Sequence, residues 1–248
     1  MSELQHPGAR SFEDVAELYE RVRPSYPDAA VDWLAELLGI DESSTVLDLG
    51  AGTGKLTRVL LGRVGRVIAV EPGPEMLAQL EHAVPEAEAI LGPAEAIPLG
   101  DDSVDAVVCG QSFHWFRTDE ALGEIARVLR PGGGLGLIWN MRDPDDSLQQ
   151  EITELLEPFV PSGRATDEGV ERFVRRTFDQ IDAHVVVFEE ELDADTVAAR
   201  VASISFVAAA AAEKRRELLE TVRALVLARG GRVPFRYRTE TYVTFSVA

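Results

Sequence analysis

The sequence is poor in cysteine, in basic residues and in long apolar runs. With Cys109 as its single cysteine, the 248-residue chain can form no internal disulfide. No Cys and His cluster has the spacing of a zinc site, so no metal is expected. Basic residues number 24 against 43 acidic ones, a formal net charge of −19. Since nucleic acids and anionic membranes are bound through basic patches, this charge argues against both partners.

Signals for export or membrane insertion are missing as well. Residues 1–10 lack the apolar core of a signal peptide, and no apolar run approaches the length of a membrane span. We therefore expect a cytoplasmic protein. A hydrophobic content of 46% is ordinary for a globular chain of this length, so we expect one domain over residues 1–248. The oligomeric state cannot be predicted from these features.

The most informative stretch is residues 48–56, which read Asp-Leu-Gly-Ala-Gly-Thr-Gly-Lys-Leu. An apolar run precedes it and an amphipathic stretch follows, a pattern that predicts a strand, a turn and a helix. Glycines in such a turn bring the backbone against a nucleotide-like ligand, because a Cβ would block the approach. Glu71 ends the next apolar run, and its carboxylate can accept hydrogen bonds from ribose hydroxyls.

Two other nucleotide-binding motifs fit this loop poorly. A phosphate-binding P-loop requires G-x-x-x-x-G-K-[ST], but Leu49 and Leu56 replace the first glycine and the hydroxyl residue. A dinucleotide fingerprint requires G-x-G-x-x-G, and Lys55 holds the position of its third glycine. The pattern present, D-x-G-x-G-x-G, resembles the first motif of the class I S-adenosylmethionine-dependent methyltransferases. Glu71 resembles the acid at the end of their second strand.

The remaining pattern alternates apolar runs with amphipathic stretches, which predicts a doubly wound α/β sheet. The expected strands cover residues 45–50, 66–71, 87–91, 104–110, 135–140, 184–192 and 236–247. The expected helices cover residues 54–62, 74–83, 118–130, 147–157, 167–178 and 195–229, after an N-terminal helical element over 11–38. Gly39 is the expected stop of that element.

The resemblance extends beyond the glycine loop. Residues 102–108 resemble the fourth strand, and residues 129–133 the turn before the fifth strand, of the type-11 group of small-molecule methyltransferases. Residues 94–99 resemble their segment beside the adenine. Residues 19–27 resemble an N-terminal element of the branch that includes trans-aconitate methyltransferase-like proteins. The match is strong over about residues 11–140 and depends on the strand pattern thereafter.

This resemblance implies a Rossmann-like sheet of seven strands, mostly parallel, with the last antiparallel. The single domain would consist of a helical element over the active site at 11–38, a cofactor-binding core at 45–140, and C-terminal helices and two strands at 141–248. S-adenosylmethionine would lie at the carboxyl ends of the first two strands. The residues implied to contact it are Tyr19, Asp48, Gly50, Ala51, Gly52, Gly54, Glu71, Pro72, Ala94, Glu95, Cys109 and Gln111.

Where many relatives carry an acid for the adenine amino group, this chain has Pro93, so that contact would come from Glu95, a backbone carbonyl or water. His114 stands four residues beyond the fourth predicted strand, where this fold places the reacting centre. It is a candidate general base or substrate-orienting group. Arg23 is a candidate clamp for a substrate carboxylate, with Arg142 as the alternative. Tyr26 and Trp115 complete the candidate substrate residues.

Two functions from different classes stay open. The first is an enzyme that transfers a methyl group from S-adenosylmethionine to a small molecule, with a hydroxyl or carboxylate oxygen as the expected acceptor. The second is a non-catalytic S-adenosylmethionine-binding protein that acts as a sensor or a partner subunit. The glycine loop and Glu71 serve either function, while a polar group such as His114 near the transferred methyl favours the enzyme.

Overall fold

The computed structural model describes residues 22–116, 118–161 and 180–245. The chain divides into two compact units. Of the residues described, the helical unit contains 22–24, 141–161 and 187–238, and the sheet unit contains 25–116, 118–140, 180–186 and 239–245. Whether the two units form the single domain expected over residues 1–248 stays a prediction. In the described part of the chain, no helix combines the length and apolarity needed to cross a membrane.

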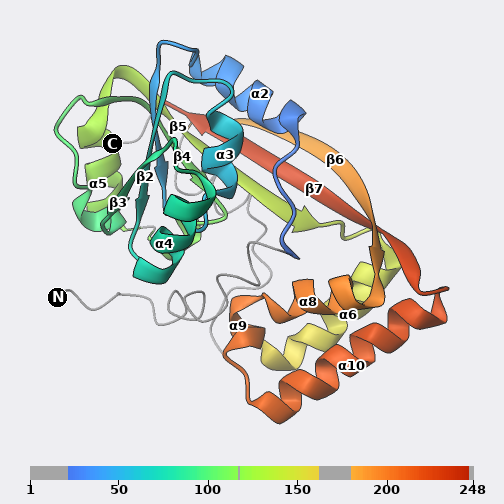
Figure 1. The fold of residues 1–248 in the computed structure, drawn as a ribbon. Coiled ribbons are helices and arrows are strands. Elements are labelled where there is room, and N and C mark those ends of the chain that lie inside the picture. Colours follow the sequence, from blue (N-terminus) through green and yellow to red (C-terminus); the bar gives the residue numbers. More distant parts are fainter. Residues whose placement is uncertain (1–21, 117, 162–179, 246–248) are drawn as a thin grey trace. The chain divides into compact units, whose positions relative to one another are not determined.

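Seven strands form one sheet in the order β3-β2-β1-β4-β5-β7-β6 (Figure 1). Their bounds are β1 Thr45–Leu49, β2 Arg66–Glu71, β3 Glu88–Leu91, β4 Val104–Gly110, β5 Leu129–Arg142, β6 Asp182–Asp193 and β7 Arg232–Thr244. Strands β1 to β5 pair in parallel, and β7 is antiparallel to both β5 and β6. The predicted fold class is thus confirmed. The strand order reverses between β1 and β4, which is where α/β sheets of this kind bind ligands.

Helices of the sheet unit pack against side chains that point from alternate residues of the strands. The helices of this unit are α2 Asp28–Leu38, α3 Lys55–Leu60, α4 Pro74–Ala83 and α5 Asp119–Val128, with short turns η2 Ala94–Ala96 and η3 Phe113–Trp115. Residues of α2 and α3 share one apolar cluster with Val46, Val67 and Val108 of the strands. Period-two alternation in the strands and an apolar stripe on each helix bring these side chains together.

The end of α2 follows from one glycine. Gly39 adopts a left-handed backbone with φ of 65°, a conformation that costs glycine little. The N–H groups of Gly39 and Ile40 then donate to the carbonyls of Glu36 and Ala35, which satisfies the last turn. The stop predicted at Gly39 is confirmed.

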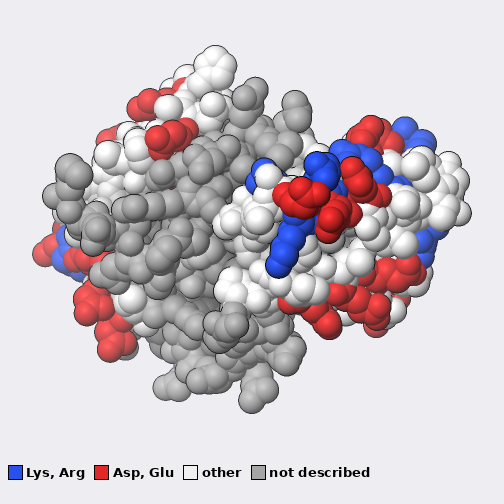
Figure 2. Space-filling view, turned by 90° about the horizontal axis from the view of Figure 1, so that it is seen from below, with Lys and Arg blue, Asp and Glu red and all other residues white. Residues whose placement is uncertain are grey.

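The described helices of the helical unit are α6 Ser147–Leu156, α8 Ala194–Ala202, α9 Ser205–Ala208 and α10 Ala212–Ala228, with the turn η4 Glu157–Phe159. Their apolar faces form a separate core that includes Ile152, Val197 and Val222. Many exposed residues of α10 are charged, and on the face drawn in Figure 2 basic and acidic side chains lie side by side. Exposed pairs such as Arg223 with Asp195 contribute little to stability.

Two expectations about element bounds were wrong. The single helix expected over residues 195–229 is divided into α8, α9 and α10. The alanine run is interrupted between α9 and α10, where Ala209 and Ala211 are exposed. Alanine favours helix formation but has little side chain to bury, so its helix propensity alone does not keep the helix continuous. Strand β5 begins at Leu129 rather than near 135, with a register irregularity against β4. The helix predicted over 167–178 lies outside the described residues.

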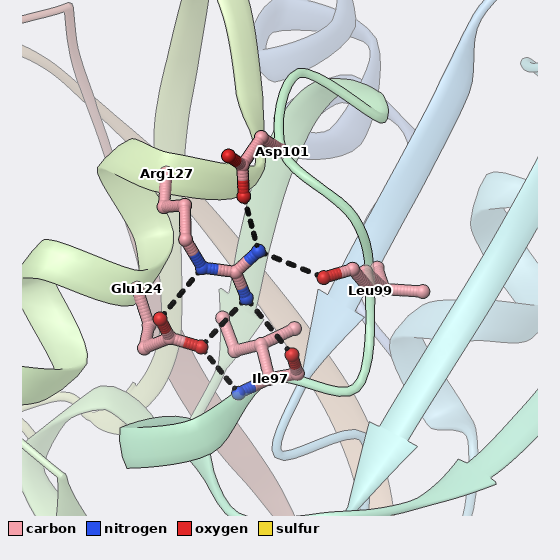
Figure 3. Close-up of polar contacts among 5 residues, drawn as sticks. All are labelled: Ile97, Leu99, Asp101, Glu124 and Arg127. Atoms are coloured by element: carbon pink, nitrogen blue, oxygen red, sulfur yellow. Dashed lines mark hydrogen bonds and ion pairs between the residues drawn. The ribbon is translucent and has the colours of Figure 1, made fainter.

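The segment that follows η2 is fixed to α5 by one arginine (Figure 3). Arg127 donates to both carboxylate oxygens of Glu124, each at 2.7 Å, and to the carbonyls of Leu99 and Ile97 at 2.8 and 3.0 Å. It also pairs with Asp101 at 2.9 Å, and Glu124 in turn accepts the Ile97 N–H at 2.8 Å. The planar guanidinium thus satisfies backbone groups that no regular ladder reaches.

We expect Arg127→Ala to lower the free energy of unfolding by about 2 kcal/mol, the usual loss for hydrogen bonds to a charged group. Arg127→Lys should recover only part of this loss, because an ammonium cannot reproduce the fork of donors. Equilibrium urea unfolding measures the change. The control is Arg216→Ala, an exposed helix pair with Glu213, which should change stability by less than about 0.5 kcal/mol. Equal losses in the Arg127 and Arg216 variants would contradict the interpretation.

Candidate active site

The loops that follow β1 and β4 meet where the strand order reverses. The Ser112 hydroxyl donates to the Leu49 carbonyl at 2.8 Å. A Cβ added at Gly50 would lie 2.7 Å from the Cβ of Ser112, so no larger residue fits there. The Ser112 side chain therefore packs against the backbone of Leu49 and Gly50, at the crevice where a doubly wound sheet binds its ligands.

The three loop glycines have left-handed backbones for different reasons. Their φ angles are 68° at Gly50, 59° at Gly52 and 85° at Gly54. At Gly54 a Cβ would lie 2.9 Å from the Val84 side chain, so α4 fills that space. At Gly52 no protein atom lies within 4 Å of an added Cβ. Of the three, Gly52 is the position at which a ligand could approach the backbone closely.

Glu71, at the end of β2, holds this loop in place. Its Oε2 accepts the Gly52 N–H at 2.8 Å, and its Oε1 accepts the Gly73 N–H at 2.9 Å. The side chain is buried, with 8% of the residue exposed. A carboxylate offers about four acceptor positions, so these two bonds are compatible with a role toward ribose hydroxyls. The predicted acid and the predicted glycine loop are therefore one hydrogen-bonded structure.

Asp48 lies beneath the loop and is 1% exposed. Its Oδ2 accepts the Thr57 hydroxyl at 2.6 Å, which joins the end of β1 to the first turns of α3. Its Oδ1 is buried and has no hydrogen-bond partner among the described residues. Burial raises the pKa of Asp48 to about 7, although the Thr57 hydrogen bond acts against the rise. An unpartnered carboxylate oxygen in this place suits a cationic or hydrogen-donating neighbour.

Two further predicted residues follow along β4. Burial, with the nearby charge of Asp48, raises the pKa of the Cys109 thiol well above its usual value. The thiol therefore stays protonated and unreactive. Gln111 adopts a left-handed backbone with φ of 59°, unusual for a residue other than glycine. Its side-chain amide donates to the Asn140 carbonyl at 3.0 Å. Strained residues of this kind concentrate at functional sites.

The segment at Ser25 and Tyr26 is fixed against the same strand ends. A Cβ added at Gly110 would lie 2.6 Å from the Tyr26 hydroxyl, so the tyrosine rests directly on the backbone of β4. The Asn140 side chain donates to the Ser25 carbonyl at 3.1 Å and accepts the Thr239 hydroxyl at 2.7 Å. Tyr26 is thereby held beside the loop that begins at Gln111.

The remaining sheet-unit candidates lie on short turns. His114 and Trp115 belong to η3, with ring centroids 4.8 Å apart and planes tilted by 39°. Ala94 and Glu95 belong to η2, after β3, where Ala94 is buried and Glu95 half-buried. Pro72 stands between Glu71 and the Gly73 amide that Glu71 binds. Among the described residues, no group of His, Cys, Asp and Glu is placed to hold a metal ion.

The site residues predicted from the sequence fall into three groups: those in the sheet unit, those in the helical unit and one outside the described residues. The structure brings Asp48, Gly50, Ala51, Gly52, Gly54, Glu71, Cys109, Gln111 and Tyr26 to the strand ends of the sheet unit. Arg23 and Arg142 belong to the helical unit, and Tyr19 lies outside the described residues. Sequence reasoning missed Thr57, Ser112 and Asn140. A Thr in the first turn after a glycine loop was a usable signal for Thr57, whereas nothing in the spacing indicated the other two.

The raised pKa of Asp48 predicts a pH dependence of stability. Between about pH 4 and pH 7 its carboxyl is protonated in the folded chain but ionised in the unfolded chain. The folded state binds the extra proton, so the free energy of unfolding should fall as the pH rises across this range, by up to about 4 kcal/mol. Asp48→Asn should remove this fall, as measured by urea unfolding from pH 4.5 to pH 8.

The control is Asp105→Asn. Although burial opposes it, hydrogen bonds from the Thr45 N–H and Arg130 lower the pKa of Asp105. Asp105 therefore contributes to the free energy of unfolding with the opposite pH dependence from Asp48. Its stabilising contribution is present above about pH 4 and is lost as the pH falls through the lowered pKa. If the free energies of unfolding of the wild type and Asp48→Asn changed in parallel with pH, the pH dependence could not be assigned to Asp48.

Comparison with known proteins identifies the family. A family model described as a methyltransferase domain matches residues 47–137. An uncharacterized methyltransferase of Mycobacterium tuberculosis is 43% identical over 217 residues, which is 87% of this chain and 85% of that protein. A solved structure from Anaeromyxobacter dehalogenans, described as a type II methyltransferase, is 26% identical with a TM-score of 0.71, covering 89% of this chain and 97% of its own.

A shorter match is also informative. A malonyl-[acyl-carrier protein] O-methyltransferase of Methylococcus capsulatus is 41% identical over 96 residues, 36% of this chain and 35% of that protein. The resemblance of residues 19–27 to the trans-aconitate methyltransferase-like branch is not confirmed by these relatives and stays a prediction. The long relative, the family model and the shared fold agree with the glycine loop and its acid: this chain belongs to the class I methyltransferases.

Proposed function

We propose that this protein transfers a methyl group from S-adenosylmethionine to an oxygen atom of a small molecule. The observation that carries the proposal is the bond from the Gly52 N–H to the Glu71 carboxylate at 2.8 Å, on a loop whose backbone faces open space at Gly52. A ligand with a ribose and a charged tail needs both features, close backbone approach and a fixed acceptor.

The residues present fit S-adenosylmethionine. When bound, this cofactor supplies an electrophilic methyl group on a sulfonium centre. Glu71 is placed to accept ribose hydroxyls, and its bonds to Gly52 and Gly73 keep the carboxylate from turning away. The buried Oδ1 of Asp48, which lacks a partner among the described residues, suits the cofactor's cationic end directly or through water. Ala94 and Glu95 would border the adenine, and Arg127 stabilises the segment that follows them.

An oxygen acceptor has two chemical forms with different demands. A hydroxyl must lose its proton as the methyl group arrives, so a general base accelerates the transfer. His114 is the candidate, on the turn after β4. A carboxylate is already ionised at neutral pH and needs only alignment. Oxygen transfer is supported by the name of the O-methyltransferase relative, whose match covers about a third of each chain.

The alternative is a protein that binds S-adenosylmethionine without transferring its methyl group, as a sensor or partner subunit. Fold alone does not decide between the two, because the same site architecture serves both. A methyl-transfer assay against a metabolite pool, with products identified by mass, separates them. Turnover of any acceptor supports the enzyme, and tight cofactor binding with no turnover supports the alternative.

The first test is cofactor binding by isothermal titration. Wild-type protein should bind S-adenosylmethionine with a dissociation constant in the micromolar range, which corresponds to a binding free energy of about −7 to −9 kcal/mol. Gly52→Val should abolish binding, because the side chain would occupy the open space at the loop. Gly52→Ala serves where the valine variant does not fold. Glu71→Ala should weaken binding by about 1.5–3 kcal/mol.

Gly39→Val is the matched control for this test. Gly39 has nearly the same φ, 65°, and equally open space, but it lies at the end of α2. Both glycine variants therefore suffer the same backbone strain, and only the loop variant should lose the cofactor. Normal binding by folded Gly52→Val would show that the glycine loop has another purpose.

The second test separates the two acceptor forms through His114. For a hydroxyl acceptor, His114→Ala should lower kcat by roughly 10²–10⁴ with cofactor affinity unchanged. The wild-type rate should then rise as increasing pH converts the imidazole to its neutral, proton-accepting form. For a carboxylate acceptor, His114→Ala should act mainly on KM. The control is His82→Ala, an exposed histidine at the end of α4. A wild-type kcat and KM in His114→Ala would remove His114 from the active site.

A further inference from the structure

Gln111, the first residue after β4, has a backbone conformation that glutamine rarely adopts. Only two described residues other than glycine have a positive φ, Asp102 at 49° and Gln111 at 59°. They stand before and after β4, and Gln111 is the one at the carboxyl end, where the strand order reverses. A left-handed backbone is unfavourable for a residue with a side chain, so its presence at this crevice indicates a functional constraint on Gln111.

Both amide groups of Gln111 are fixed by the end of β5. The backbone N–H donates to the Ile138 carbonyl at 2.9 Å, and the side-chain Nε2 donates to the Asn140 carbonyl at 3.0 Å. Because a carbonyl can only accept, the NH2 half of the side-chain amide must face β5. The Oε1 atom is turned away from that carbonyl, and no described residue donates a hydrogen bond to it. Gln111 thus presents an oriented acceptor oxygen from a half-buried position.

The residue that holds the Gln111 side chain is itself firmly placed. Asn140 is buried, and its side chain donates to the Ser25 carbonyl at 3.1 Å and accepts the Thr239 hydroxyl at 2.7 Å. Strands β5 and β7 and the segment before α2 are therefore joined at Asn140. A side chain that is anchored before a ligand arrives loses less conformational entropy when the ligand binds.

The position of Gln111 favours a contact with the methyl acceptor over one with the cofactor. Glu71 ends β2 and Gly52 follows β1, whereas the Gln111 side chain is bound to the end of β5. Since adjacent strands lie about 4.8 Å apart, β5 is roughly 14 Å from β2, with β1 and β4 between them. A cofactor bound at Glu71 and Gly52 therefore leaves the ends of β4 and β5 for a second molecule.

The Oε1 atom distinguishes between the two forms of oxygen acceptor. A hydroxyl can donate a hydrogen bond to an amide oxygen, whereas a carboxylate at neutral pH carries only acceptor atoms. A carboxylate beside Oε1 would bring two electron-rich oxygens together and leave both without a donor. Sites built around one hydrogen bond reject molecules that cannot make it, because the polar group is then left unpaired.

We propose that Gln111 binds the methyl acceptor, and that this acceptor is an alcohol or phenol whose hydroxyl donates to the Oε1 atom. The inference rests on the proposed function and adds the chemical class of the acceptor. The hydroxyl oxygen forms the new C–O bond, the electron pair of the broken C–S bond stays on sulfur, and the hydroxyl proton passes to a base such as His114 or to water. The amide takes no proton and acts by holding the oxygen in line with the methyl group.

The acceptor class is tested in a transfer assay with methyl-labelled S-adenosylmethionine and a metabolite pool. The label should appear in a methyl ether, which mild alkali does not cleave. A methyl ester would release its label as methanol under the same treatment, and this result would overturn the inference while leaving oxygen transfer intact. An N-methyl product, or cofactor binding without any turnover, would overturn the proposed function and the inference together.

The role of Gln111 is tested with the acceptor that this assay identifies. Gln111→Met keeps an unbranched side chain and the strained backbone but lacks the oxygen, whereas Gln111→Gly removes side chain and strain together. Both variants should raise the KM of the acceptor by at least about 10-fold, with a smaller change in kcat. In calorimetry on protein saturated with S-adenosylhomocysteine, where no transfer occurs, both should bind the acceptor at least about 10-fold more weakly. The affinity for S-adenosylhomocysteine itself should stay within about 2-fold of wild type.

Asp102→Gly is the matched control, since it relieves the same kind of backbone conformation at the opposite end of β4. It should have the wild-type KM and the wild-type affinity for both ligands. A wild-type KM in Gln111→Gly would mean that the side chain is not used, and a wild-type KM in Gln111→Met would mean that only its bulk matters. Weaker binding of S-adenosylhomocysteine with unchanged binding of the acceptor would assign Gln111 to the cofactor. Each of these three results overturns the inference.

Discussion

The carboxylate of Glu71 is the constraint on which the cofactor site depends. Hydrogen bonds from Gly52 and Gly73 fix it between the loops that follow β1 and β2. The Gly50 and Ala51 N–H groups also donate to the Val70 carbonyl of β2, at 2.8 and 3.1 Å. Together these bonds order glycine-rich backbone, which loses much entropy on folding. One buried acid at the end of a parallel strand thus sets both the loop shape and an acceptor position toward the open space at Gly52.

Both units contain an ionisable group whose hydrogen bonds are incomplete. In the sheet unit Asp48 has a buried oxygen without a described partner, and in the helical unit Arg142 has a buried nitrogen in the same condition. The buried Asp48 oxygen suits a cationic or hydrogen-donating ligand group. Groups of this kind destabilise a fold unless a ligand completes them, which is why they mark binding sites more sharply than well-paired residues such as Arg127 do.

Much of the sheet unit could be predicted because its signals are local. The bounds of β2, β4 and α4 match those expected, and Gly39 ends α2 as expected, since apolar period and glycine conformation act over a few residues. The prediction of one continuous helix through the alanine-rich segment after α9 was wrong. Alanine has a high helix propensity, but its small side chain does not indicate where a helix packs or ends. The partners Ser112 and Asn140 could not be predicted, since each bonds a residue far away in the sequence.

The sequence by itself determined the fold class, the glycine loop with its acid, and through these the methyltransferase family, because a D-x-G-x-G-x-G turn after a strand has few physical uses. Only the tertiary structure decided what each residue does within that frame. It showed that Gly52 alone among the loop glycines faces open space, and that Asp48 and Arg142 each have a buried polar atom with no hydrogen-bond partner among the described residues. Burial and missing partners depend on which distant segments pack together, and no local pattern records that.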